Sequence, residues 1–114
     1  MTQNEKHSEI NTGIKHDAGK PRMDLLPFEA LEAVAHVLTF GAKKYDPWNW
    51  YKGMDHSRLI AATLRHISAD QQGENIDAES GLDHLAHAIC DLMFVYTLRK
   101  RSKGKDDRCL RSQD

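Results

Sequence analysis

The chain has 114 residues, of which 39% are hydrophobic and 29% charged, and its formal net charge is −1. This length supports one small domain with a single core, and the balanced charge gives no reason to expect nucleic-acid or membrane binding. No apolar run is long enough to span a membrane, and the two cysteines have no Cys-x-x-Cys spacing, so a cytoplasmic location without disulfides is expected. The compositional feature to explain is the number of histidines, which is seven.

The chain is expected to begin with a mobile leader, because residues 1–14 are polar and aperiodic. A basic loop follows over residues 15–27, where Gly19 and Pro21 are incompatible with a helix. Lys20 and Arg22 in this loop can bind substrate phosphates together with backbone N–H groups. A solvated basic strap explains the same residues equally well.

A first helix is expected to begin at Pro27 and to end at Gly41. Helical spacing predicts a buried stripe of Leu31, Val34, Ala35, Leu38 and Ala42. Another face carries Glu29, Glu32 and His36, and a Glu-x-x-Glu pair can hold a divalent cation. An acidic first turn favoured by the helix dipole explains Glu29 better, whereas Glu32 stays a candidate metal ligand.

The loop over residues 41–53 holds four of the eight aromatic residues of the chain. Aromatic faces stack on bases, amides can hydrogen-bond base edges, and lysines neutralise phosphates. These properties make four residues of the loop candidates for substrate binding: Lys44, Tyr45, Asn49 and Trp50. The alternative is that Trp48 and Trp50 cap the core or an oligomer interface.

A second helix is expected from an N-cap at Asp55 to near Gln72, with Gly73 as the stop signal. Its predicted inward residues are Ile60, Thr63, Leu64 and Ile67. Arg58 and Arg65 share one side and are candidates for gripping phosphate oxygens. His66 and Asp70, four residues apart, can share a metal ion, although His66 can also be a buried, hydrogen-bonded histidine.

A third helix is expected from Ser80 to Lys100, because Ser80 and Asp83 have the spacing of a capping box. His84, His87 and Asp91 then fall within about 60° of one another on one face, as candidate metal ligands. The predicted core stripe of this helix is Leu82, Leu85, Ala86, Ile89 and Met93. Residues 102–114 are charged and aperiodic, and a frayed tail is expected there.

No stretch has the pattern of a strand, so the predicted fold class is all-α, a small bundle of three main helices. A loop rich in carboxylates, including Asp77 and Glu79, joins the last two helices. Together these groups predict a divalent cation that binds nucleotide phosphates and activates a water molecule. Asp77, Glu79 and His66 are the candidate catalytic residues. The acidic groups favour Mg²⁺ or Mn²⁺, and the histidines also tolerate Co²⁺ or Zn²⁺.

Four segments resemble the phage dATP/dGTP diphosphohydrolase (MazZ-like) family: residues 17–27, 41–50, 65–66 and 79–88. The resemblance spans about residues 15–98 and implies a MazG-like, all-α nucleotide pyrophosphohydrolase. Such an enzyme cleaves a purine deoxynucleoside triphosphate, dATP or dGTP, to the monophosphate and pyrophosphate with Mg²⁺ or a related ion, and it remodels the phage nucleotide pool. Residues 15–101 are expected to form the single domain. The resemblance implies that this domain forms a dimer or tetramer, and a phage-encoded protein would act in the host cytoplasm.

MazG-like enzymes usually carry Glu-x-x-Glu followed by Glu-x-x-Asp. Here Glu29 and Glu32 match the first half, whereas Ala88 stands where a glutamate would precede Asp91. The alternative function is therefore a non-catalytic protein that sequesters nucleotides or nucleotide signals. An HD-type phosphohydrolase ranks last, because the His16-Asp17 pair lies in a loop rather than on a helix.

Overall fold

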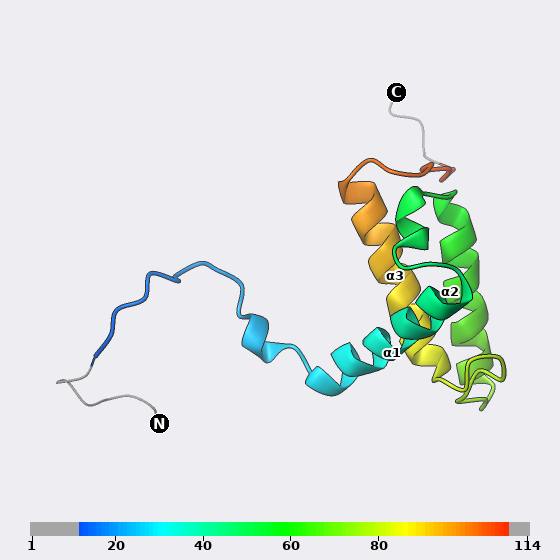
Figure 1. Ribbon diagram of the computed structural model, residues 1–114, viewed down its shortest axis with the longest axis horizontal. Helices are drawn as coiled ribbons and strands as arrows, with labels where there is room; N and C mark the ends of the chain where they lie inside the picture. The colour runs from blue at the N-terminus through cyan, green and yellow to red at the C-terminus, as the bar shows by residue number, and fades with distance from the viewer. Residues whose placement is uncertain (1–11, 110–114) are drawn as a thin grey trace.

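Three α-helices form the body of the computed structural model, which describes residues 12–109 (Figure 1). α1 spans Phe28–Lys44, α2 spans His56–Gln71 and α3 spans His84–Lys100, with short 3₁₀ helices at Met23–Leu25 (η1) and Asn49–Lys52 (η2). α3 packs against both α1 and α2. The described residues contain two isolated β-bridges and no strand, which confirms the all-α bundle of three helices. Most of the predicted leader, residues 1–11, lies outside the described part.

Two hydrophobic clusters hold the helices together. Val34 and Val37 of α1 pack against Ala86 and Cys90 of α3. A second cluster joins α2 to α3 through Leu59, Val95 and Leu98. Its edge is closed by Trp50, whose ring stacks on Phe94 at 4.3 Å between centroids and 10° between planes. Trp50 therefore contributes to the core, as one of the two sequence interpretations expected.

The ends of α2 agree with the sequence signals, and those of α1 differ slightly. Asp55 is the N-cap of α2, and Gly73 follows the helix with a φ of +97°. Pro27 caps α1 rather than forming its first residue, and α1 continues past Gly41 to Lys44. One glycine inside a helical pattern lowers stability but does not end the helix.

α3 begins at His84, four residues after the predicted start, and its N-cap is Asp83. The prediction of a capping box that starts at Ser80 is therefore wrong. The Asp77 carboxylate accepts hydrogen bonds from both the backbone N–H and the hydroxyl of Ser80, each 3.0 Å long. This local turn uses the side chain that would have capped the helix, and Gly81 follows it with a φ of +73°.

The predicted core stripes are wrong in part, because several of their residues face outward. Leu85, Ile89 and Met93 of α3 are 51%, 42% and 46% exposed, whereas the histidine-bearing side of the helix faces inward. The same is true of other predicted core residues on α1 and α2: Leu31, Ala35, Leu38, Leu64 and Ile67. Apolar residues occur on every side of α3, including the side that carries the histidines, so periodicity alone cannot select its buried side. Its exposed row, named the α3 stripe below, consists of Leu85, Ile89, Leu92 and Tyr96.

The segment after α3 folds back onto the start of α2. The carbonyl of Lys105 accepts a 2.9 Å hydrogen bond from the backbone N–H of His56, and Asp107 accepts one from Ser57 at 3.0 Å. The buried imidazole of His56 lies 2.8 Å from the carbonyl of Lys103. The part of the predicted tail up to Asp107 is thus hydrogen-bonded rather than frayed. None of the described helices is long and apolar enough to cross a bilayer.

Gly104→Ala is expected to destabilise the protein by about 2–4 kcal/mol. Gly104 has a φ of +72°, and an added Cβ would collide with the carbonyl oxygen of Met54. Gly73→Ala is the matched control, because Gly73 also has positive φ but no atom lies within 4 Å of its Cβ position. Urea unfolding of both variants separates the cost of the collision from that of the backbone angle. Equal losses would contradict tight packing of the C-terminal segment.

Candidate metal centre

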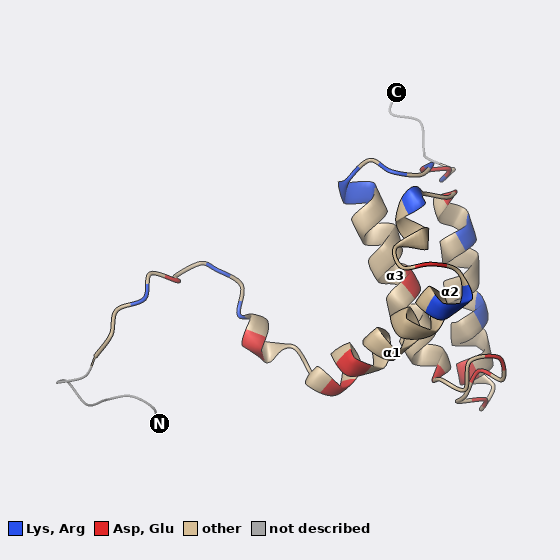
Figure 2. Cartoon of the chain, viewed as in Figure 1, with Lys and Arg blue, Asp and Glu red and all other residues tan. Residues whose placement is uncertain are grey.

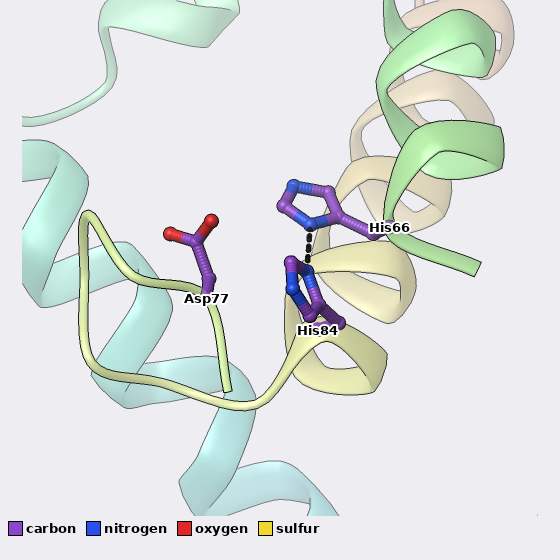
Figure 3. A group of neighbouring side chains, drawn as sticks. All are labelled: His66, Asp77 and His84. Carbon is purple, nitrogen blue, oxygen red and sulfur yellow. Dashed lines mark hydrogen bonds between the residues drawn. The ribbon is translucent and has the colours of Figure 1, made fainter. Parts of the chain in front are cut away.

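Three imidazoles meet where α2 passes the first turn of α3. His66 comes from α2, and His84 and His87 come from α3. The Nδ1 atoms of His66 and His84 are 2.8 Å apart, so one ring donates a hydrogen bond to the other (Figure 3). His87 stacks on His66 with 4.6 Å between ring centroids. Helical spacing predicted the pair on α3, and His66 was a separate candidate on α2; the structure brings the three imidazoles together.

Asp77 completes the group from the loop between α2 and α3. Its carboxylate lies beside the His66 and His84 rings, and one ligand atom from each of these three residues falls within 4.8 Å of the other two (Figure 3). Burial raises the pKa of Asp77, but the two hydrogen bonds from Ser80 and the nearby imidazoles outweigh it, so the pKa lies below its usual value. The carboxylate is therefore ionised at neutral pH.

Two of the neighbouring imidazoles, those of His66 and His87, have pKa values that favour the neutral form. Burial lowers the pKa of His66, and the neighbouring histidines lower it further. Burial also lowers the pKa of His87, although Asp77 opposes the shift. Neutral rings keep a nitrogen lone pair, which is the form that binds metal ions.

Two residues of the cluster were missed as site residues in the sequence. Ser80 joins His87 to Asp77, because its hydroxyl is 2.7 Å from Nε2 of His87 and donates to the carboxylate. Glu74 lies 3.3 Å from Nε2 of the buried His84. The signal for Ser80 was its position three residues after Asp77, a spacing typical of side-chain turns as well as of helix caps.

The other predicted metal ligands lie outside the His66–Asp77–His84 group. Glu32 is exposed on α1, 3.9 Å from His36, and Asp70 accepts a hydrogen bond from Gln71 at the end of α2. Asp91 is half-buried on α3, where the charge of Arg65 acts on it.

The predicted substrate-binding residues fall into three regions. Lys44 pairs with Glu79 and lies over the ring of Tyr45, so the aromatic loop begins beside the acidic loop. Arg58 and Arg65 are exposed on α2, and Asn49 and Trp50 belong to η2. Lys20 and Arg22 lie on the N-terminal segment, which projects from the body (Figures 1 and 2).

One aromatic residue of the loop is held in an unusual conformation. Trp48 is 67% exposed and has a φ of +65°, the left-handed region that bulky side chains seldom adopt. Such conformations occur mainly at binding sites and switches, where the surrounding structure maintains them.

Asp91→Asn is expected to stabilise the protein at pH 8 by about 1–2 kcal/mol, less than the full pKa shift would give because the side chain is partly exposed. Burial raises the pKa of Asp91 to about 6, against the opposing charge of Arg65. The folded state therefore binds a proton between about pH 6 and pH 4 that the unfolded state does not bind, and this group costs stability as the pH rises. The gain should be absent at pH 4. Urea unfolding at both pH values tests it, and a loss at pH 8 would contradict the assigned environment.

The donor set fits a divalent transition-metal ion. Two nitrogen ligands of one ion, each bonded at about 2.0–2.1 Å, lie roughly 3 Å apart, which is close to the separation of the His66 and His84 Nδ1 atoms. Imidazoles with one carboxylate suit Mn²⁺, Co²⁺ or Zn²⁺, whereas Mg²⁺ prefers oxygen ligands. Asp77 and His87 are already fixed by Ser80, as ligands and their neighbours are in metal sites.

A family model described as "dATP/dGTP diphosphohydrolase, N-terminal" matches residues 10–108. The chain belongs to this family. The three imidazoles of His66, His84 and His87 and the carboxylate of Asp77 all lie inside the region matched by this dATP/dGTP diphosphohydrolase N-terminal family.

A relative from Salmonella phage PMBT28, named dATP/dGTP diphosphohydrolase, is 40% identical to the chain over 97 residues. The alignment covers 85% of this chain and 33% of the relative, so the chain spans about a third of the length of that protein. No solved structure matches the chain.

Proposed function

We propose that the chain hydrolyses dATP and dGTP to the monophosphate and pyrophosphate, using a divalent cation held by His66, Asp77 and His84. The observation that supports this most is the convergence of these three residues in a domain of the dATP/dGTP diphosphohydrolase family. The 40% identity to a phage protein named for this activity supports the choice of substrate.

A bound cation would supply positive charge to the phosphate oxygens and promote ionisation of a water molecule. The chain's own residues would do the rest. Asp77 is held ionised by Ser80 and suits a ligand better than a base, which leaves Glu79 as the proton acceptor for the attacking water. Water adds to the α-phosphorus, the bond to the bridging oxygen breaks, and pyrophosphate leaves. Lys44 and Arg65 would balance its charge.

The donor set also supports a preference among cations. Two or three imidazoles favour Mn²⁺ or Co²⁺ over Mg²⁺, although Mg²⁺ is the ion that the family resemblance implies. Isothermal titration calorimetry of the chelator-treated protein with each ion would measure this preference without any substrate. Tighter binding of Mg²⁺ than of Mn²⁺ would contradict a site built on histidines.

We also propose that the chain acts as a homo-oligomer. The α3 stripe is 42–65% exposed and has i, i+4, i+7 and i+11 spacing, which is typical of a helix face that packs on another helix. A second copy of the chain would cover it.

The test of the function is incubation of the pure protein with each dNTP and NTP in the presence of Mn²⁺, Co²⁺ or Mg²⁺, with chromatographic separation of the products. Purine deoxynucleoside monophosphate and pyrophosphate are expected. Nucleoside and triphosphate would indicate HD-type chemistry instead. Tight retention of a nucleotide without turnover would support the sequestering protein.

A further inference from the structure

The first described part of the chain, residues 12–27, is named the N-terminal arm below. It projects away from the three helices (Figure 1), and every one of its residues is exposed. Its shape is nevertheless locally defined, because Lys20 donates a backbone hydrogen bond to Asp17 at 3.0 Å and Arg22 forms two side-chain hydrogen bonds with Asp24. The radius of gyration is 19.5 Å, whereas a compact chain of this length would have about 13 Å.

The arm exposes more apolar surface than a solvated strap needs. Ile14, Met23 and Leu25 are 78%, 66% and 70% exposed, and Phe28, at the start of α1, is 70% exposed. Side chains of this size are normally covered, and a group of them marks an interaction surface. The α3 stripe is a matching uncovered apolar face on the same molecule.

The arm carries three cations, Lys15, Lys20 and Arg22, against two carboxylates, Asp17 and Asp24, whereas the charged residues of the loop between α2 and α3 are all acidic (Figure 2). Within the described residues, Lys15 and Lys20 form no ion pair. In the acidic loop, Glu74 lies within 4 Å of His84 and Asp77 within 4 Å of His87, and neither carboxylate pairs with a lysine or arginine of the described residues. A phosphate group bound at the metal centre would bring further negative charge to this loop.

The direction of α1 separates the arm from the acidic loop of its own chain. Lys44, at the C-terminal end of α1, pairs with Glu79 of that loop. The helix has 17 residues and is therefore about 25 Å long, so the arm leaves from the far end of α1. A second copy of the chain can cover the apolar residues of the arm with its α3 stripe and pair with the cations of the arm through its acidic loop.

We propose that the N-terminal arm docks on a second copy of this chain, with its apolar residues on that copy's α3 stripe and Lys20 and Arg22 at that copy's acidic loop. There the two cations neutralise the phosphates of the nucleotide. The exposed apolar and charged surfaces support the docking itself, whereas the role of the two cations in phosphate binding rests on the proposed function.

Cross-linking tests the docking without any activity. Two pools of chains with one accessible cysteine each are made in a Cys109→Ser background: Lys20→Cys in one and Glu74→Cys in the other. Cys90 stays silent, because it is 1% exposed. The mixed pools, treated with a short bismaleimide, are expected to give a covalent dimer on a denaturing gel. The control pool is Lys100→Cys, at the opposite end of α3 from the acidic loop, and should give far less dimer with the arm pool. No dimer, or equal dimer with the control, would overturn the docking.

Subunit mixing tests the role of the cations. The Lys20→Ala/Arg22→Ala variant is expected to lose at least about tenfold in turnover, and His66→Ala at least about 100-fold. In a mixture, half of the dimers are mixed and one of their two sites is intact, so about a quarter of the wild-type rate should return. No recovery in a mixture whose cysteine counterparts cross-link would overturn the cations' role. If the wild-type chain itself hydrolyses neither nucleotide, the proposed function fails, and the cross-link alone decides the docking.

Discussion

His66→Ala is expected to lower the turnover of dATP and dGTP by at least about 100-fold, since loss of a residue that only supports a metal ligand already costs 10–100-fold. His66 touches both other imidazoles of the cluster, through its Nδ1 contact with His84 and its stacking on His87. The alanine variant removes one of three candidate ligands and the hydrogen-bond partner of the His84 Nδ1 atom. Steady-state rates with Mn²⁺, together with the metal content of the purified protein, measure the effect.

The matched control is His36→Ala. His36 is an exposed histidine on α1, and its contact is Glu32 at 3.9 Å. Its loss should leave both turnover and metal content within about twofold of the wild type, because an exposed pair contributes little. A His66→Ala protein that folds, binds metal normally and keeps wild-type turnover would contradict the assignment of the metal centre.

Leu98→Ala is expected to destabilise the protein by about 2–5 kcal/mol, the usual cost of deleting most of a fully buried leucine. Leu98 has 0% exposure and packs with Leu59 and Val95 where α2 and α3 meet. A domain of this size has a free energy of unfolding of only about 5–15 kcal/mol, so a drop of roughly 10–20 °C in the unfolding midpoint should follow. Thermal unfolding followed by circular dichroism measures it.

Leu64→Ala is the control for this prediction. Leu64 lies on α2 but is 59% exposed, so the same chemical change should cost about 0.5–1 kcal/mol. Equal losses of stability at the two positions would contradict the assignment of Leu98 to the core and of Leu64 to the surface.

The order and class of the elements were predictable from the sequence, because the signals that define them are local. Asp55 and Gly73 mark the ends of α2 within a residue or two. The same local reasoning placed the start of α3 too early at Ser80. A side chain that can cap a helix can equally bind a neighbouring carboxylate, and only the folded loop decides between the two.

The residues of the candidate site were predictable from the sequence, but the contacts between them were not. Spacing on α3 selected His84 and His87 together, and the structure keeps them together with His66 and Asp77. Asp91 shares that spacing but lies a turn further along the helix, where burial and Arg65 govern its charge. The meeting of α2, α3 and the acidic loop is a tertiary event, so no pattern within one segment could have specified it.

The thiol of Cys90 has a consequence for how the molecule opens. It lies between α1 and α3 beside Val34 and Val37, and burial raises its pKa to about 12. A thiol in that state does not react with alkylating reagents while the helices are together. The rate at which the thiol is labelled in the native protein would therefore report how often α1 detaches from α3. Equilibrium unfolding does not resolve this local opening.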